Sequence, residues 1–201
     1  MATLTPLLNA LADLTETEPG TEAFVTANIL RSAASTKKFR LEPPSILDAE
    51  IRAAAQSPDA LPAARLVAAA QSFLLWQASP AAALQPSGLA ATKAVVTLVS
   101  PEGPIHASDI RCGLYFQAPG TYYPLHAHNA AETYTILAGT ALWQAGNDRS
   151  PRDPGAAIHH PPRMPHAMRA GPNGFLAIWR WSGDIAFESY HMIPDPEDPA
   201  R

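Results

Sequence analysis

The chain has 201 residues, of which 47% are hydrophobic and 16% are charged, and its formal net charge is −4 at pH 7. This length suits one domain with an appendage, and it is long enough to bury a substantial core. The acidic balance argues against nucleic acid as a partner, because a phosphate backbone calls for a basic surface.

Two further features bound the setting in which the protein works. No apolar run approaches the ~20 residues of a membrane span, and the N-terminus lacks the basic flank and apolar centre of a signal peptide. We therefore expect a soluble, cytoplasmic protein with no membrane partner. We also expect it to be a monomer or a homodimer. Cys112 is the single cysteine, so no intrachain disulfide can form, and a buried, thiol-bearing hydrophobe is expected there.

Residues 1–85 are rich in alanine and leucine and follow a helical period. A first helix is predicted because leucines recur on one of its faces, at Leu4, Leu7, Leu8, Leu11 and Leu14. Pro19 and Gly20 end that helix, and Thr21 is the expected N-cap of a second helix that runs to about Ser35. Further helices are expected over residues 46–56 and 61–77.

The character of the chain changes to strands after residue 90. Short β-rich runs at 94–99, 113–117 and 175–181 are separated by Gly/Pro turns, a pattern typical of an antiparallel jelly roll over residues 90–193. In the last run Trp179 and Trp181 share a face, with Arg180 opposite. The helical segment is expected to pack against this barrel and could cover one of its mouths. Residues 194–201 are predicted to be a frayed tail.

The stretch from Gly120 to Gly139 is the most informative part of the chain. It follows the pattern G-x5-H-x-H-x3-E-x6-G at every specified position, with His126, His128 and Glu132 between the two glycines. Residues two apart in a strand share a face, so the two imidazoles point the same way. Together with a later histidine, they form a typical ligand set for a divalent metal such as zinc or ferrous iron.

A second punctuated stretch supplies that histidine. It follows G-x5-P-x-G-x2-H-x3-N at Gly155, Pro161 and His166, but Arg163 stands where glycine is expected and Ala170 where asparagine is expected. The two stretches together match the two motifs of the cupin superfamily. The resemblance implies a mainly β fold with some α, a cupin (jelly-roll) β-barrel preceded by an N-terminal helical segment.

Aromatic residues around the motifs narrow the chemistry. Tyr134 shares a strand face with Glu132, so we expect it to point at the metal, where a nearby cation would favour the phenolate. Tyr122 and Tyr123 lie just before the first motif histidine. Electron-rich aromatic faces can hold a quaternary or sulfonium cation, so residues expected to bind substrate are Tyr122, Trp143, Trp179 and Trp181.

The chain resembles the cupin-type dimethylsulfoniopropionate (DMSP) lyases, the DddQ type in particular. The resemblance rests on Tyr123-x-x-His126-x-His128-x3-Glu132-x-Tyr134, on the interval to His166, and on a helical segment before one barrel. It implies metal ligands at His128, Glu132, Tyr134 and His166, with His126 in or beside the first sphere. It also implies catalytic tyrosines at Tyr134 and Tyr123.

The reaction implied by this resemblance is a β-elimination that needs one divalent ion, Zn, Fe, Mn, Co or Ni. The metal would bind the carboxylate of DMSP and acidify the adjacent C–H, and the carboxylate would displace the Tyr134 oxygen. The freed phenolate would take the α-proton, so that dimethyl sulfide leaves and acrylate remains. Aromatic faces of Tyr123 and the tryptophans would hold the sulfonium.

Two other functions fit the same ligand set. A cupin dioxygenase or other oxidoreductase would use iron and O₂ on a small organic acid, without needing Tyr134. The other is a non-enzymatic, ligand-sensing cupin. The intact ligand set and the absence of a recognisable DNA-binding segment weigh against the sensor.

Overall fold

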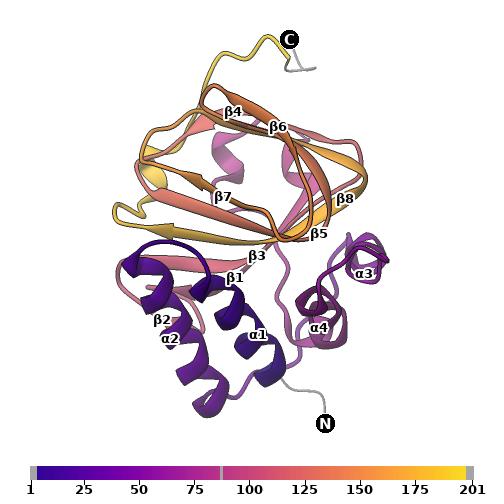
Figure 1. Ribbon diagram of the computed structural model, residues 1–201, viewed down its shortest axis with the longest axis vertical. Helices are drawn as coiled ribbons and strands as arrows, with labels where there is room; N and C mark the ends of the chain where they lie inside the picture. Colours follow the sequence, from indigo (N-terminus) through magenta and orange to yellow (C-terminus); the bar gives the residue numbers. More distant parts are fainter. Residues whose placement is uncertain (1–3, 87, 198–201) are drawn as a thin grey trace.

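The computed structural model describes residues 4–86 and 88–197, and it places a helical layer beneath a β-barrel (Figure 1). The N-terminal end of the chain lies at the helical side, and the C-terminal end lies beyond the far side of the barrel. The helices are α1 (Thr5–Glu16), α2 (Thr21–Thr36), α3 (Asp48–Ala55) and α4 (Pro62–Ala70). Short 3-10 turns follow at η1 (Gln71–Phe73), η2 (Ala82–Leu84) and η3 (Leu89–Thr92).

Two details of the helices differ from the prediction. Thr21 is the first residue of α2 and not its N-cap; Gly20 occupies the cap with a φ of 105°, a conformation that glycine adopts without steric cost. The helix predicted over 61–77 ends at Ala70. Beyond it the chain becomes extended, so that Leu74 and Trp76 are buried and Gln77 pairs with Val95.

The barrel contains nine strands in one highly curved sheet. They are β1 (Lys93–Ser100), β2 (Ile105–His106), β3 (Ile110–Gln117), β4 (Tyr122–Ala127), β5 (Ala131–Ala145), β6 (Asp148–Arg152), β7 (Ala157–His160), β8 (His166–Ser182) and β9 (His191–Met192). All named strand pairs are antiparallel except β1 with β2. The long strand β5 pairs with β6, β7 and β8, and β8 also pairs with β3 and β4, which closes the jelly roll.

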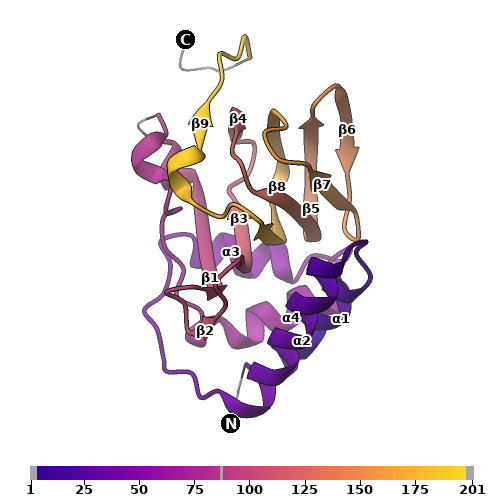
Figure 2. The same ribbon diagram turned by 90° about the vertical axis from the view of Figure 1, so that its left-hand side faces the viewer.

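The alternation of side chains along the strands creates two cores. One core fills the barrel with aromatic residues, among them Tyr115, Tyr134, Trp143, Phe175 and Trp179. The other lies between the barrel's outer wall and the helices, and it includes Leu8, Leu11, Leu30, Ile51, Leu114, Leu137 and Ile178. The helices therefore cover the outer face of the sheet around β1, β3, β5 and β8 (Figure 2), and not a barrel mouth, because their apolar stripes match this apolar wall.

Cys112 belongs to the helix-facing core. It is fully buried on β3, as the sequence predicted for the free thiol. Burial raises the pKa of Cys112 to about 12.

A buried ion pair joins the helical layer to the barrel. Arg180 on β8 donates to the Oε2 atom of Glu18, in the turn after α1, over 2.8 Å. Thr135 donates to the other carboxylate oxygen of Glu18 over 2.6 Å. As predicted, Arg180 points away from the barrel interior, where Trp179 and Trp181 lie.

The segment after β9 is anchored, which contradicts the prediction of a frayed tail at this point. Asp195 is buried and accepts hydrogen bonds from the Tyr122 hydroxyl (2.7 Å) and from the backbone N–H of Leu125 (2.8 Å). Glu197 forms an ion pair with Arg149. The remaining residues of the predicted tail, 198–201, lie outside the described residues.

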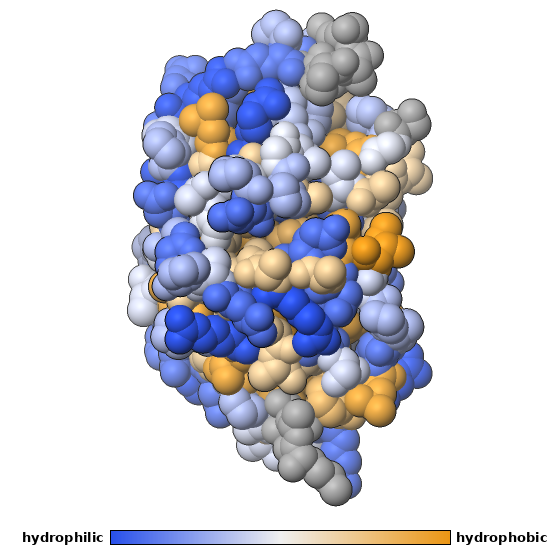
Figure 3. Space-filling model, turned by 90° about the vertical axis from the view of Figure 1, so that its right-hand side faces the viewer, coloured by the Kyte–Doolittle hydropathy of each residue, from blue (hydrophilic) through white to orange (hydrophobic). Residues whose placement is uncertain are grey.

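The surface agrees with this inward placement of apolar residues. On the face drawn in Figure 3, hydrophilic side chains surround small, separate groups of apolar ones. Within the described ranges, no helix is both long and apolar enough to cross a membrane.

Candidate metal centre

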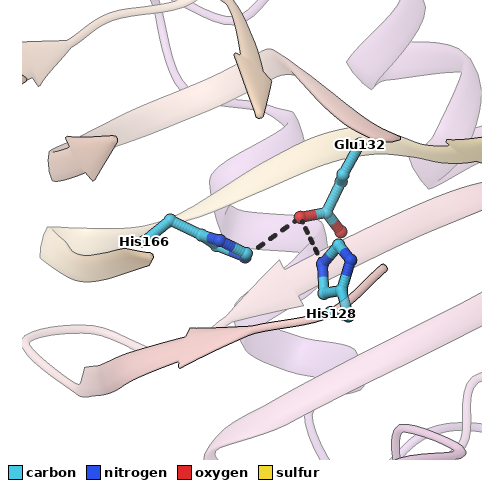
Figure 4. Close-up of side chains that lie close together, drawn as sticks. All are labelled: His128, Glu132 and His166. Carbon is cyan, nitrogen blue, oxygen red and sulfur yellow. Dashed lines mark hydrogen bonds and ion pairs between the residues drawn. The ribbon is translucent and has the colours of Figure 1, made fainter. Parts of the chain in front are cut away.

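Two histidines and one glutamate converge inside the barrel. His128 follows β4, Glu132 lies near the start of β5 and His166 is the first residue of β8. One ligand atom from each lies within 4.8 Å of the others, and all three side chains are buried. Figure 4 shows the two imidazoles directed at the Glu132 carboxylate from different segments of the chain.

Backbone carbonyls fix the orientation of the imidazoles. The Nδ1–H group of His128 donates to the carbonyl of Ala130 over 3.1 Å, and that of His166 donates to Met164 over 2.9 Å. A proton on Nδ1 leaves Nε2 with its lone pair, and in both rings Nε2 faces Glu132, at 3.3 and 3.1 Å. Such hydrogen bonds on the far nitrogen are typical of metal-binding histidines.

The carboxylate of Glu132 is held in its ionised form. Burial alone would raise its pKa, but the surrounding imidazoles, His128 most strongly and then His160 and His166, hold the pKa well below its usual value. The indole N–H of Trp181 donates to Oε1 over 2.6 Å, while Oε2 faces the histidines.

These donors fit a divalent cation. Two lone-pair nitrogens and an ionised carboxylate oxygen are the ligand types that zinc and ferrous iron accept. Nε2 of His166 is buried and makes no hydrogen bond to any described residue despite its contact with Glu132. A buried acceptor of this kind calls for a partner, and a metal ion would supply one.

His126 lies beside this group and not in it. Its Nδ1–H donates to the carbonyl of Pro124 over 2.8 Å, and its ring centroid lies 4.0 Å from that of His166. Burial, followed by the charge of His166, lowers the pKa of His126 well below its ordinary value. The ring is therefore neutral.

His160 is a buried member of the site that the motifs did not indicate. The indole N–H of Trp143 donates to its Nε2 over 2.9 Å, so Nδ1 carries the proton and faces Oε2 of Glu132 at 3.1 Å. Burial, and then the charge of His166, lowers the pKa of His160 to about 4. The strand register pairs Glu132 with His160, and only that long-range pairing reveals the contact.

A small cavity of about 40 Å³ opens onto the centre. It is bordered by residues 79–81 and by the segment around η4 (Phe187–Ser189), which lie at the same edge of the barrel. Predicted site residues on its wall are Tyr123, His126, His128, Glu132, Tyr134, Trp179 and Trp181.

Two of the predicted substrate-binding residues lie away from this cavity. The Tyr122 ring lies beneath Arg169, 4.2 Å from the guanidinium carbon, and its hydroxyl is bonded to Asp195. Trp143 is fully buried in the barrel core and supports His160. Proline at position 124 and a register shift in β4 separate Tyr122 from the face that carries His126.

Two tyrosines on the cavity wall, Tyr123 and Tyr190, form part of a hydrogen-bonded chain. Gln85 donates to the Tyr123 hydroxyl over 2.9 Å, and the Tyr123 and Tyr190 hydroxyls lie 2.8 Å apart. Tyr134 packs against the ring of Trp143 and borders Glu132. Burial, and then the charge of Glu132, raises the pKa of Tyr134 well above its ordinary value.

The departure from the second motif at Arg163 leaves the turn geometry intact. Arg163 adopts a φ of 65°, the only positive φ at a described non-glycine residue. Its backbone N–H donates to the carbonyl of His128 over 2.8 Å. The turn before His166 therefore keeps the left-handed conformation for which glycine is favoured, and it ties the two ligand-bearing segments together.

An antiparallel jelly roll with an inward-facing His–Glu–His group defines a cupin. Residues 27–177 match the family model of the dimethylsulfoniopropionate lyases. The chain belongs to this family.

Individual relatives agree with this assignment. The chain is 33% identical over 101 residues to dimethylsulfoniopropionate lyase DddQ of Ruegeria pomeroyi, covering 50% of each protein. It is also 33% identical over 100 residues to the putative lyase DddL of Cereibacter sphaeroides, covering 49% of this chain and 42% of that one. The aligned stretches thus span half or less of these curated relatives.

Solved structures extend the similarity to almost the whole fold. The crystal structure of DddQ from Ruegeria pomeroyi aligns with a TM-score of 0.66 at 25% identity, covering 90% of this chain and 92% of that one. A chain from a study of the DMSP lyases RdDddP and RnDddQII aligns with a TM-score of 0.69 at 24% identity, covering 95% and 97%. The second similarity concerns the fold alone.

Proposed function

We propose that this protein is a metal-dependent lyase that cleaves DMSP to dimethyl sulfide and acrylate. Membership of the family supports the substrate. The observation that carries the proposal is that Tyr134 lines the same cavity as His128 and Glu132, two of the three residues of the His128–Glu132–His166 group. A ligand in that cavity would meet both at once.

The centre would be held by His128, Glu132 and His166, with His126 and Tyr134 beside it. A bound divalent ion, whether Zn, Fe, Mn, Co or Ni, would act as a Lewis acid toward the substrate carboxylate and would oppose the effects that raise the pKa of Tyr134. His160 and Trp181 hold the two oxygens of Glu132 from behind. They keep the carboxylate in one orientation during binding.

Tyr134 is the proposed general base. Its phenolate oxygen would take the proton from the carbon next to the substrate carboxylate. The electron pair of that C–H bond becomes the new C=C bond, and the pair of the C–S bond leaves with sulfur as neutral dimethyl sulfide. The sulfonium is a good leaving group, so no general acid is needed. Tyr123 is the alternative base, or else it orients the substrate through its hydroxyl.

The sulfonium would lie against Trp179 and Trp181, both on the cavity wall. The expected contribution of the Tyr123 face does not fit the structure. His126 stacks on that ring with centroids 3.9 Å apart, and the Lys93 ammonium lies 3.2 Å from its centroid. These two groups cannot share one face at such distances, so both faces are occupied.

The test is product release from DMSP under argon. Wild-type protein loaded with a divalent metal should release dimethyl sulfide and acrylate without O₂. Tyr134→Phe removes only the ionisable oxygen, so folding should survive while elimination falls ~10²–10⁴-fold, as for a lost general base. Headspace analysis and acrylate quantification measure the two products.

Each contrary outcome has a definite meaning. Turnover that stops when O₂ is excluded would favour the dioxygenase. Binding of small organic acids without turnover would favour the sensor. Unimpaired elimination by Tyr134→Phe, with Tyr123→Phe inactive, would transfer the base to Tyr123.

A further inference from the structure

Lys93, the first residue of β1, places a cation in the wall of the cavity. Among the lining residues that the structure describes, it is the only lysine or arginine. The side chain is 3% exposed, so the amine does not reach solvent as lysines usually do. Its Nζ atom donates to Oε1 of Gln85 over 2.8 Å and lies over the Tyr123 ring.

This ammonium has no anionic partner within the described parts of the chain. Its neighbours are a neutral amide and an aromatic face, and none of the salt bridges between described residues involves it. Glu132, on the same cavity wall, is already engaged by three histidines and Trp181. Burial lowers the pKa of Lys93 well below its ordinary value, because an isolated buried charge is costly.

We propose that Lys93 is an anion-binding residue that receives one carboxylate oxygen of the substrate. A carboxylate offers two oxygens and about four lone-pair sites, so one oxygen can meet Lys93 while the other faces the His–Glu–His group. The opposite end of a zwitterionic substrate then points away from the ammonium, toward Trp179 and Trp181. The identity of the substrate rests on the proposed function, whereas the anion site rests on Lys93 and its surroundings.

Two half-substrates separate the two ends of this pocket. Propionate carries the carboxylate without the sulfonium, and trimethylsulfonium carries the cation without the carboxylate. Binding of each to metal-loaded protein is measured by calorimetry, for wild type, for Lys93→Met and for the control Lys38→Met, which removes an exposed lysine just after α2.

Loss of a charge-assisted hydrogen bond should weaken propionate binding to Lys93→Met by roughly 10–100-fold. Trimethylsulfonium should bind to this variant at least as tightly as to wild type, since a repulsive charge is gone. Because an uncompensated buried charge is removed, Lys93→Met should also melt no lower than wild type. The control should match wild type in every measurement.

A second variant reaches the same site without touching the amine. Gln85→Glu places a carboxylate beside Lys93 and should occupy it internally, so propionate should again bind more weakly while trimethylsulfonium does not. Equal propionate affinity in wild type and both variants would overturn the proposal, as would wild type that fails to bind propionate. With DMSP, Lys93→Met should raise KM more than it lowers kcat.

The anion site and the proposed function can fail separately. Wild type that binds propionate through Lys93 but releases no dimethyl sulfide would retain the anion site and refute DMSP cleavage. Wild type that releases dimethyl sulfide with Lys93→Met unchanged in propionate affinity and KM would retain the lyase and refute the role of Lys93.

Discussion

At the scale of single residues, the imidazoles around Glu132 divide into candidate metal ligands and a ring that supports the carboxylate. His128 and His166 have their Nδ1 atoms bonded to backbone carbonyls and present Nε2 to the centre. His160 has the opposite arrangement, because Trp143 occupies its Nε2. The hydrogen-bond pattern thus assigns a tautomer and a role to each ring.

The three candidate metal ligands, His128, Glu132 and His166, lead to a prediction on metal content. Purified wild-type protein should hold close to one divalent ion per chain, and Glu132→Ala or His166→Ala should remove most of it. His126→Ala should lose less than His128→Ala, since His126 lies outside the group of three. Elemental analysis of folded protein measures this, and full occupancy in the Glu132 and His166 variants would rule out the assignment.

The support role of His160 can be separated from ligation. His160→Phe keeps a ring in the buried position but removes the hydrogen bond to Glu132, so metal affinity should fall by about 10–100-fold, as for other outer-shell partners. Competition with a chromophoric chelator gives the affinity. His159→Phe, one residue away and exposed, is the control and should bind metal like wild type.

The sequence spacing predicts that some of these residues lie close together, but not others. His126, His128 and Glu132 are close in the chain, so strand parity and one short turn are enough to place them. His160 reaches Glu132 through the register of β7 against β5, and Lys93 lies on the cavity wall as the first residue of β1. Such positions depend on how distant strands pair, which local patterns do not encode.

At the scale of elements, the same limit applies to the helix predicted over 61–77. Its composition remains helical past Ala70, but Gln77 forms two backbone hydrogen bonds with Val95. The chain must be extended to reach that partner, so tertiary pairing overrides local propensity. The alternation of residues 175–181 correctly predicted that Arg180 points to the face opposite Trp179 and Trp181, because the strand period is independent of tertiary contacts.

The pair formed by Arg180 and Glu18 provides a prediction at this scale. Glu18→Ala leaves a buried guanidinium without its counter-charge and should lower the free energy of unfolding by about 3–5 kcal/mol. Glu16→Ala, which breaks the partly exposed contact with Arg31, is the matched control and should cost under ~1 kcal/mol. Urea denaturation measures both, and equal losses would show that the buried pair contributes no more than a surface pair.

At the scale of the whole molecule, the helical layer and the barrel share one apolar interface. Leu8, Leu11 and Leu30 pack in the same core as Leu114, Leu137 and Ile178. Removing residues 1–80 would expose this wall of the barrel to water. Large exposed apolar patches lead to association.

We therefore expect the chain without residues 1–80 to be insoluble or unfolded. Expression of this fragment, followed by circular dichroism and metal analysis of any soluble fraction, measures the outcome. A soluble, folded fragment with full activity would instead show that the helices are an independent appendage.

The position of Cys112 has a consequence for the lifetime of the catalyst. Acrylate is a conjugate electrophile, and thiolates are the side chains it alkylates most readily. The only thiol of the chain lies on the helix-facing side of β3, with its pKa raised to about 12, so the barrel wall separates it from the product. The one thiol of the chain is therefore shielded from any acrylate that forms at the centre, which closes that route of self-alkylation.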